Sequence, residues 1–129
     1  DAYYKSPGPK GLLTVYGENL PANVLSYGNM KFYRLLAVDV SRFPEMAQAF
    51  YASGLRKSLQ TLADRLDEGI ELGLVRPVNT FRMAERYYAA LTGLSQRRAL
   101  ACMPLDKAAE RKVYMNETVE MSLELLTPR

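Results

Sequence analysis

The sequence predicts an all-α fold, a helical bundle of about five helices, and two observations support this. Apolar residues recur at the three- and four-residue spacing of a helix along most of the 129 residues. No segment shows the sustained alternation with β-branched residues that is typical of a strand. Proline and glycine cluster at 7–11, 17–28 and 73–77, and these clusters mark the expected ends of helices. The length is that of one domain with its own core.

The first three helices are expected over about 9–19, 29–41 and 44–72. Between the second and the third lies Arg42-Phe43-Pro44-Glu45. Proline is well placed in a first helical turn, because its missing N–H would be unpaired there anyway. The segment therefore predicts a corner between two helices. Ser53-Gly54 is a candidate bend within the third helix.

Two more helices complete the expected bundle. Gly73 would end the third helix as its C′ residue. The fourth helix is expected over about 78–102, with Asn79 or Thr80 near its start, and the fifth over about 105–126. The third helix is amphipathic, with one apolar face formed by Leu55, Leu59, Leu62, Leu66 and Ile70.

The fourth and fifth helices each carry two apolar stripes. One stripe can pack on the domain's own core, whereas the other needs a partner. A self-complementary two-fold interface is the default for such a surface, so a homodimer is expected. A monomer in which both stripes are internal is the alternative. The residues expected at the dimer interface are Tyr88, Leu91, Thr118, Met121 and Leu125.

The composition argues against an enzyme. The chain has no histidine, which excludes the usual general base, the Ser-His and Cys-His nucleophile systems and most zinc sites. A single cysteine, Cys102, excludes an internal disulfide and suits a reducing compartment. The sequence has no run of about 18 apolar residues, so no membrane-spanning segment is predicted. We therefore expect a cytoplasmic protein without a catalytic residue, a cofactor or a metal. The net charge of +3 is only weak evidence for a polyanionic partner.

The corner at 42–46 carries a resemblance to a known family. Arg42-Phe43-Pro44-Glu45-Met46, preceded by an apolar helix with an acidic residue at Asp39, resembles the C-terminal ligand-binding and dimerisation domain of TetR/AcrR-family transcriptional regulators. Many members have Arg-Phe-Pro-Glu-Leu at this junction. The tail of the third helix, at 71–77, resembles the turn that precedes the family's next long helix. The resemblance implies an all-helical effector-binding and dimerisation domain over 14–129.

Residues 1–13 resemble the family junction that ends the recognition helix and begins the next helix. They would be the remnant of the helix-turn-helix DNA-binding domain. The resemblance places Tyr4 and Lys10 as contacts to DNA phosphates, where a helix N-terminus adds N–H donors and positive dipole. The match is incomplete, because Pro9 replaces the capping serine. In addition, residues 14–28 are shorter than the family's usual connection, so the chain is expected to be a divergent member or to lack residues there.

Aromatic and methionine side chains on the middle helices suit an adaptable, mostly apolar effector pocket. The pocket is expected between the helices at 29–41, 44–72 and 78–102, near the corner at Phe43-Pro44. Ordinary core packing is the alternative for each of these residues taken singly. The expected effector-binding residues are Tyr33, Phe43, Met46, Phe50, Tyr51, Leu62, Met83 and Tyr87.

Together these features predict a one-component transcriptional regulator, most simply a repressor. Its expected partners are a second copy of the chain, operator double-stranded DNA bound through an upstream helix-turn-helix, and a small, largely apolar effector. No association with a membrane is expected. The alternative is a helical dimerisation or small-molecule binding module without a DNA role.

Overall fold

The structure is a computed structural model that describes residues 8–23, 38, 41–101, 103 and 107–128. Every regular element in these residues is a helix, which confirms the all-α prediction. The helix expected at 29–41 lies almost entirely outside the described residues.

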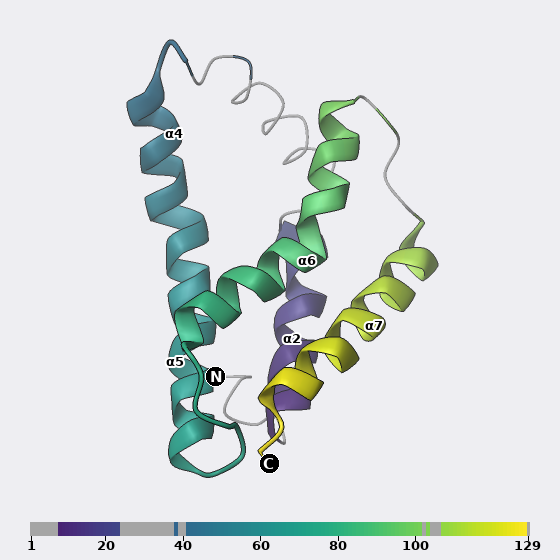
Figure 1. The fold of residues 1–129 in the computed structure, drawn as a ribbon. Coiled ribbons are helices and arrows are strands. Elements are labelled where there is room, and N and C mark those ends of the chain that lie inside the picture. Colours follow the sequence, from purple (N-terminus) through teal and green to yellow (C-terminus); the bar gives the residue numbers. More distant parts are fainter. Residues whose placement is uncertain (1–7, 24–37, 39–40, 102, 104–106, 129) are drawn as a thin grey trace.

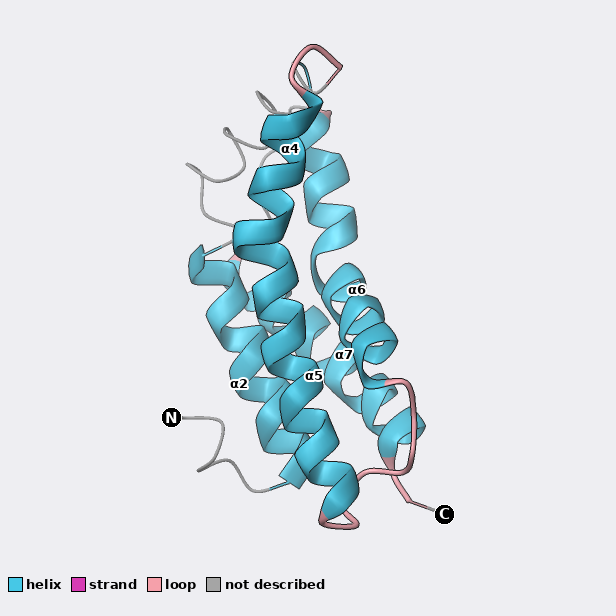
Figure 2. Ribbon diagram, turned by 90° about the vertical axis from the view of Figure 1, so that its left-hand side faces the viewer, coloured by secondary structure: helices cyan, strands magenta, loops and turns pink. Residues whose placement is uncertain are grey.

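Four helices form a closed ring. They are α2 (Gly8–Asn23), α5 (Arg56–Glu71), α6 (Thr80–Leu100) and α7 (Ala108–Leu126). Both α2 and α6 pack against α5 on one side and against α7 on the other. Neighbours in the ring run antiparallel (Figures 1 and 2), and the first half of α6 and all of α7 run obliquely to α2 and α5 in the view of Figure 1. The ring encloses one core.

The third expected helix is one continuous rod made of three segments. It begins with α4 (Pro44–Phe50), continues through a π-helical segment, η1 (Tyr51–Leu55), and ends with α5. Pro44 lies at the first helical position after Phe43, as the corner predicted. The π-helical segment occupies the position of the candidate bend at Ser53-Gly54. The described part of the chain therefore contains four helical rods rather than about five helices.

The first helix was expected to end near residue 19, and that prediction is wrong. α2 continues through Gly17 to Asn23. Gly17 does not break the helix because it lies on the face that α6 and α7 cover. A Cβ at this position would lie 2.9 Å from Met115 Sδ and 3.2 Å from the hydroxyl of Tyr87. The glycine therefore allows close helix packing rather than a turn.

The turn after α5 has the hydrogen bonds of a Schellman motif, and Gly73 lies at its C′ position as predicted. Gly73 has a φ of 74°. Its N–H donates to Ile70 O at 3.1 Å, and the N–H of Leu74 donates to Gly69 O at 2.9 Å. Val75 is buried against Gly69, where a Cβ would lie 2.7 Å from its Cγ2.

Short contacts hold this end of the ring together. Asn79 caps α6, since its Oδ1 accepts from the N–H of Arg82 at 3.1 Å. The Thr80 hydroxyl donates to Asp67 Oδ1 at 2.8 Å, which joins α6 to α5. The N–H of Arg76 donates to Leu126 O at 2.9 Å, which joins the end of α7 to the same turn.

The core draws apolar side chains from all four ring helices. α5 contributes the face that its amphipathic pattern predicted, with Leu59, Leu62, Ala63 and Leu66 all buried. The remaining buried apolar residues come from α2, the turn at Val75, α6 and α7, and they are Leu12, Leu13, Tyr16, Leu20, Met83, Ala84, Tyr87, Leu91, Met115, Val119 and Leu126.

Candidate functional site

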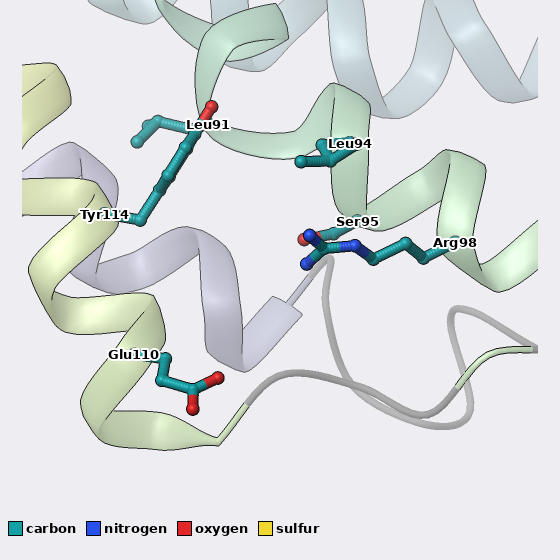
Figure 3. Close-up of a pocket in the computed structure, with 6 residues that line it drawn as sticks. All are labelled: Leu91, Leu94, Ser95, Arg98, Glu110 and Tyr114. Atoms are coloured by element: carbon teal, nitrogen blue, oxygen red, sulfur yellow. The ribbon is translucent and has the colours of Figure 1, made fainter.

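A pocket of about 230 Å³ lies between the second half of α6 and the first half of α7. Figure 3 shows its six lining residues, four from α6 and two from α7. They are Leu91, Leu94, Ser95, Arg98, Glu110 and Tyr114. The four residues of α6 recur at helical spacing, and Glu110 and Tyr114 are four apart, so each set lines one face of its helix.

A change of direction in the middle of α6 makes room for this pocket. Figure 1 shows that α6 changes direction midway and that its second half rises away from α7. Thr92 and Gly93 lie in this middle region. The buried hydroxyl of Thr92 donates to Tyr88 O at 2.8 Å, a back-bond to the preceding turn that bends helices. Glycine next to it adds backbone freedom.

A hydrogen bond fixes the narrow end of the pocket. The hydroxyl of Tyr114 donates to the carbonyl of Ala90 at 2.7 Å and so ties α7 to the middle of α6. Leu91 beside it is buried, whereas Leu94 is half exposed. This end of the pocket is therefore apolar and held in place.

The pocket also carries one charge of each sign. Arg98 lies in the last turn of α6 and Glu110 in the first turn of α7. Each charge is favourable at its own helix end, because a helix C-terminus attracts cations and an N-terminus attracts anions. Figure 3 shows their charged groups extending toward each other from opposite walls. The pocket thus combines an apolar end with a dipolar rim.

None of the predicted effector-binding residues that the structure describes lines this pocket. Leu62, Met83 and Tyr87 are buried in the core of the ring. Phe43, Met46 and Tyr51 are exposed on α4, the π-helical segment and the corner before them. The described residues that were predicted to bind an effector therefore fall into two separate groups, one buried in the ring and one exposed. Tyr33 and the side chain of Phe50 lie outside the described residues, as does most of 29–41, so the pocket expected there stays a prediction.

Tyr87 forms the centre of a small polar cluster inside the core. Its hydroxyl donates to Leu13 O at 2.8 Å, and its ring lies 6.1 Å from that of Tyr16. The hydroxyls of Tyr16 and Ser58 share a hydrogen bond of 2.8 Å. Burial raises the pKa of the Tyr87 phenol well above its ordinary value, and the neighbouring Tyr16 adds to the shift. The cluster connects α2 with α5 and α6.

The residues expected at a dimer interface differ in exposure. Met121 and Leu125 are 55% and 47% exposed on α7, and Tyr88 is half-buried. Leu91 and Thr118 are buried within the chain, where the Thr118 hydroxyl donates to Tyr114 O at 2.8 Å. The exposed apolar surface of α7 includes Val113 and Tyr114 as well.

The first turn of α2 contains Lys10, the residue expected at a DNA phosphate. Its side chain is 68% exposed, and its Nζ lies 3.2 Å from Glu120 Oε1 on α7. Tyr4, the other expected phosphate contact, lies outside the described residues. Lys10 is thus accessible and already has an acidic partner.

Within the described ranges, no group of three or more cysteine, aspartate or glutamate side chains could hold a metal ion. No helix among the described residues is long and apolar enough to cross a membrane.

Sequence reasoning did not find Ser95, Arg98, Glu110 or Tyr114. The four lining residues of α6 share a helical face, and this spacing was a visible signal. Glu110 and Tyr114 are also four residues apart, but their place opposite α6 depends on how the helices pack, which the spacing does not show.

Comparisons with known proteins add a family and a fold. Residues 11–125 match the family model described as the C-terminal domain of AefR-like transcriptional repressors. A crystal structure assigned to a TetR-family transcriptional regulator of Mesorhizobium loti MAFF303099 superimposes with a TM-score of 0.83 at 20% identity. The match covers 93% of this chain and 59% of that one, so the chain spans about three fifths of that protein. No curated protein matched the sequence.

Proposed function

This chain belongs to the AefR-like C-terminal domain family of TetR-type transcriptional regulators, and from that premise we propose that it is the effector-binding and dimerisation domain of a one-component repressor. The observation that carries the proposal is the family match over 11–125, supported by a fold shared with a longer regulator.

The proposed repressor reads DNA through a helix-turn-helix outside the described residues. Residues 1–13 would join that domain to this one, and α2 would be the connecting helix. Lys10 supports this role, since its ammonium group is exposed in the first turn of α2. A lysine there positions the protein on the phosphate backbone but does not read the base sequence.

The proposed dimer pairs α6 and α7 with the same helices of a second copy. Met121 and Leu125 supply exposed apolar surface on α7, and Tyr88 on α6 is half-buried. Leu91 and Thr118, which are buried within the chain, would support this surface from behind. An isologous interface then sets the distance between the two DNA-reading domains, which must match the spacing of the operator half-sites.

Effector control completes the proposal. An effector changes DNA binding only if it binds the DNA-incompetent arrangement more tightly than the competent one. A second candidate, a helical binding module without a DNA role, has no specific observation in its favour.

A selection on DNA tests the proposal. The intact protein is incubated with random double-stranded fragments, and the enriched sequences are read. The proposal expects a site with two-fold symmetry, and a reporter gene placed behind that site should be more active when the protein is absent. No enrichment over repeated rounds would contradict the DNA role, and a less active reporter would indicate an activator.

Lys10→Ala refines this test. The variant should bind all sequences more weakly, and the slope of log affinity against log salt should fall by about one unit. A loss confined to particular base sequences would show that Lys10 does not contact a phosphate.

A further inference from the structure

The contact between α2 and α7 includes an ion pair at the start of α2. Lys10 Nζ lies 3.2 Å from Glu120 Oε1. The first turn of α2 contains no acidic residue, and the acidic partner of Lys10 comes from α7 instead. Figure 1 shows the start of α2 and the end of α7 at the same end of the ring. The ion pair therefore joins the proposed DNA-connecting helix to the last helix of the ring.

Two contacts hold this part of α7 in place. Before Glu120, Met115 lies against Gly17 of α2. After it, the carbonyl of Leu126 accepts a hydrogen bond of 2.9 Å from the N–H of Arg76. The backbone that carries the Glu120 carboxylate is thus held between two points of the ring, and the helix packing keeps the carboxylate within reach of Lys10.

The ion pair and the proposed dimer interface lie on different faces of α7. An α-helix turns by about 100° per residue, so Met121 and Leu125 lie about 100° and 140° around the axis of α7 from Glu120. Glu120 instead reaches Lys10 on α2. Both charged side chains are more than half exposed. A second subunit on the other face therefore leaves Lys10 accessible to DNA.

A DNA phosphate at Lys10 would have to share the ammonium group with the Glu120 carboxylate. An ammonium group has three donors, so both anions could contact it. Two anions that each lie about 3 Å from one nitrogen are at most about 6 Å apart, and like charges at that distance repel each other. Either the carboxylate moves away or the phosphate is bound less tightly. In both cases the ion pair opposes phosphate binding.

From this arrangement we propose that Glu120 is an internal competitor of the DNA phosphate at Lys10, so that the α2–α7 ion pair limits the affinity of the intact protein for DNA. The inference rests on the proposed function, because it takes Lys10 as a phosphate contact. Exposed ion pairs are weak, so the pair lowers DNA affinity by about two- to fivefold per subunit. A dimer that uses both lysines multiplies the two factors, to about four- to 25-fold.

The ion pair also couples the position of α7 to DNA affinity. A molecule that holds α7 against α2 keeps Glu120 beside Lys10 and weakens DNA binding. A molecule that separates the two helices releases Lys10 and strengthens DNA binding. Because such coupling is reciprocal, DNA binding in turn loosens the contact between α7 and α2.

Fluorescence anisotropy of a labelled random-sequence duplex with the intact protein tests the inference. Glu120→Gln should bind the duplex about four- to 25-fold more tightly than wild type at low salt. The gain should shrink at high salt, because ions screen the pair. It should be equal on operator DNA, since a phosphate contact does not read the bases. Affinities are compared at protein concentrations where sedimentation shows the same assembly for every variant.

Two control variants remove the same charge from neighbouring exposed positions of α7. They are Glu117→Gln and Glu124→Gln. Each should give a smaller gain in DNA affinity than Glu120→Gln, because an exposed charge without Lys10 beside it acts on the phosphates only through screened, longer-range repulsion. An equal gain in either control would show a general effect of net charge and would overturn the proposal.

A double-mutant cycle shows whether Lys10 is the point of competition. In the Lys10→Ala background, Glu120→Gln should no longer raise DNA affinity. A gain that persists without Lys10 would contradict the proposal. Weaker binding by Glu120→Gln in the wild-type background would also contradict it, because the carboxylate would then orient Lys10 toward the phosphate.

The remaining outcomes separate this inference from the proposed function. Operator binding by wild type that neither Glu120→Gln nor Lys10→Ala changes would overturn the inference and leave the repressor standing. If wild type bound neither random DNA nor any enriched site, the proposed function would fail and the inference would fail with it.

Discussion

α4 and α5 are parts of one continuous rod, yet they differ in how much of their surface is covered. α5 packs against α2 and α6 and buries four apolar residues. Among the described elements, α4 contacts mainly the π-helical segment that continues it, and Met46 on it is 57% exposed. Both segments carry apolar side chains at helical spacing. The difference teaches that such a pattern becomes a core only where neighbouring helices close around it.

The largest expected effect comes from removing apolar groups in the covered segment. Leu62→Ala should lower the free energy of unfolding by about 2–5 kcal/mol, because Leu62 is fully buried and its loss leaves a cavity. Met46→Ala, the matched control on α4, should change it by less than about 0.5 kcal/mol. Urea denaturation measures both. A large loss for Met46→Ala would show that α4 is covered in solution and would break the comparison.

A pair of glycine variants sharpens the comparison within the ring. Gly17→Ala places a Cβ against Met115 and Tyr87, whereas Gly93→Ala meets nothing within 4 Å. The first variant should be destabilised by about 1–3 kcal/mol through overpacking. The second should be stabilised by about 0.5–1 kcal/mol, because alanine favours a helix. Thermal unfolding orders the two, and a stable Gly17→Ala would mean that α2 and α7 separate easily.

Tyr87 gives a smaller effect that depends on pH. Tyr87→Phe removes the hydrogen bond to Leu13 O and should cost about 0.5–1.5 kcal/mol near neutral pH. The raised pKa means that the unfolded chain loses this proton first, near the ordinary value of 10.0. The contribution of Tyr87 to stability is therefore complete below that pH and declines as the pH rises above it.

The measurement is the free energy of unfolding as a function of pH. Wild type should lose stability more steeply above pH 10.0 than Tyr87→Phe. Parallel curves would contradict the assigned burial of the phenol. Tyr114→Phe is the control, because its hydroxyl bonds a carbonyl at an exposed position.

The smallest effect is expected at the surface of the covered region. Lys10→Met or Glu120→Gln removes an ion pair whose side chains are 68% and 64% exposed. Each variant should change the free energy of unfolding by less than about 1 kcal/mol, and less still in high salt. A double-mutant cycle measures the coupling. A value well above that limit would mean that this pair, and not only the core, holds α2 against α7.

Several features were predictable from the sequence because local chemistry decides them. Pro44 begins a helix and Gly73 ends one, each for a reason contained in the residue itself, and Asn79, one of two residues expected near the start of the next helix, caps it. The buried face of α5 followed from its leucine spacing. The TetR-family assignment rested on the short motif around Phe43-Pro44, and the family match confirms it.

Other features could not be predicted, because they depend on contacts between helices. The proline and glycine cluster at 17–28 indicated a helix end near residue 19, yet α2 continues to Asn23, and Gly17 lies where Met115 of α7 comes close. The aromatic and methionine residues of the middle helices looked like one set. The ring buries Met83 and Tyr87 but leaves Phe43 and Met46 exposed. The α6–α7 pocket depends on the bend of α6 and on the register of two helices.

The π-helical segment Tyr51–Leu55 has a consequence for the direction of side chains around the rod. Each α-helical residue turns the chain by about 100°. A segment with hydrogen bonds to the fifth residue is wider and turns less per residue. If positions are traced back from Leu59 at α-helical spacing, those reached in α4 therefore no longer lie on the same face of the rod as Leu59. The π-helical segment therefore determines the direction around the rod axis in which the apolar side chains of α4 point. This direction differs from the one in which α5 points its leucines into the core.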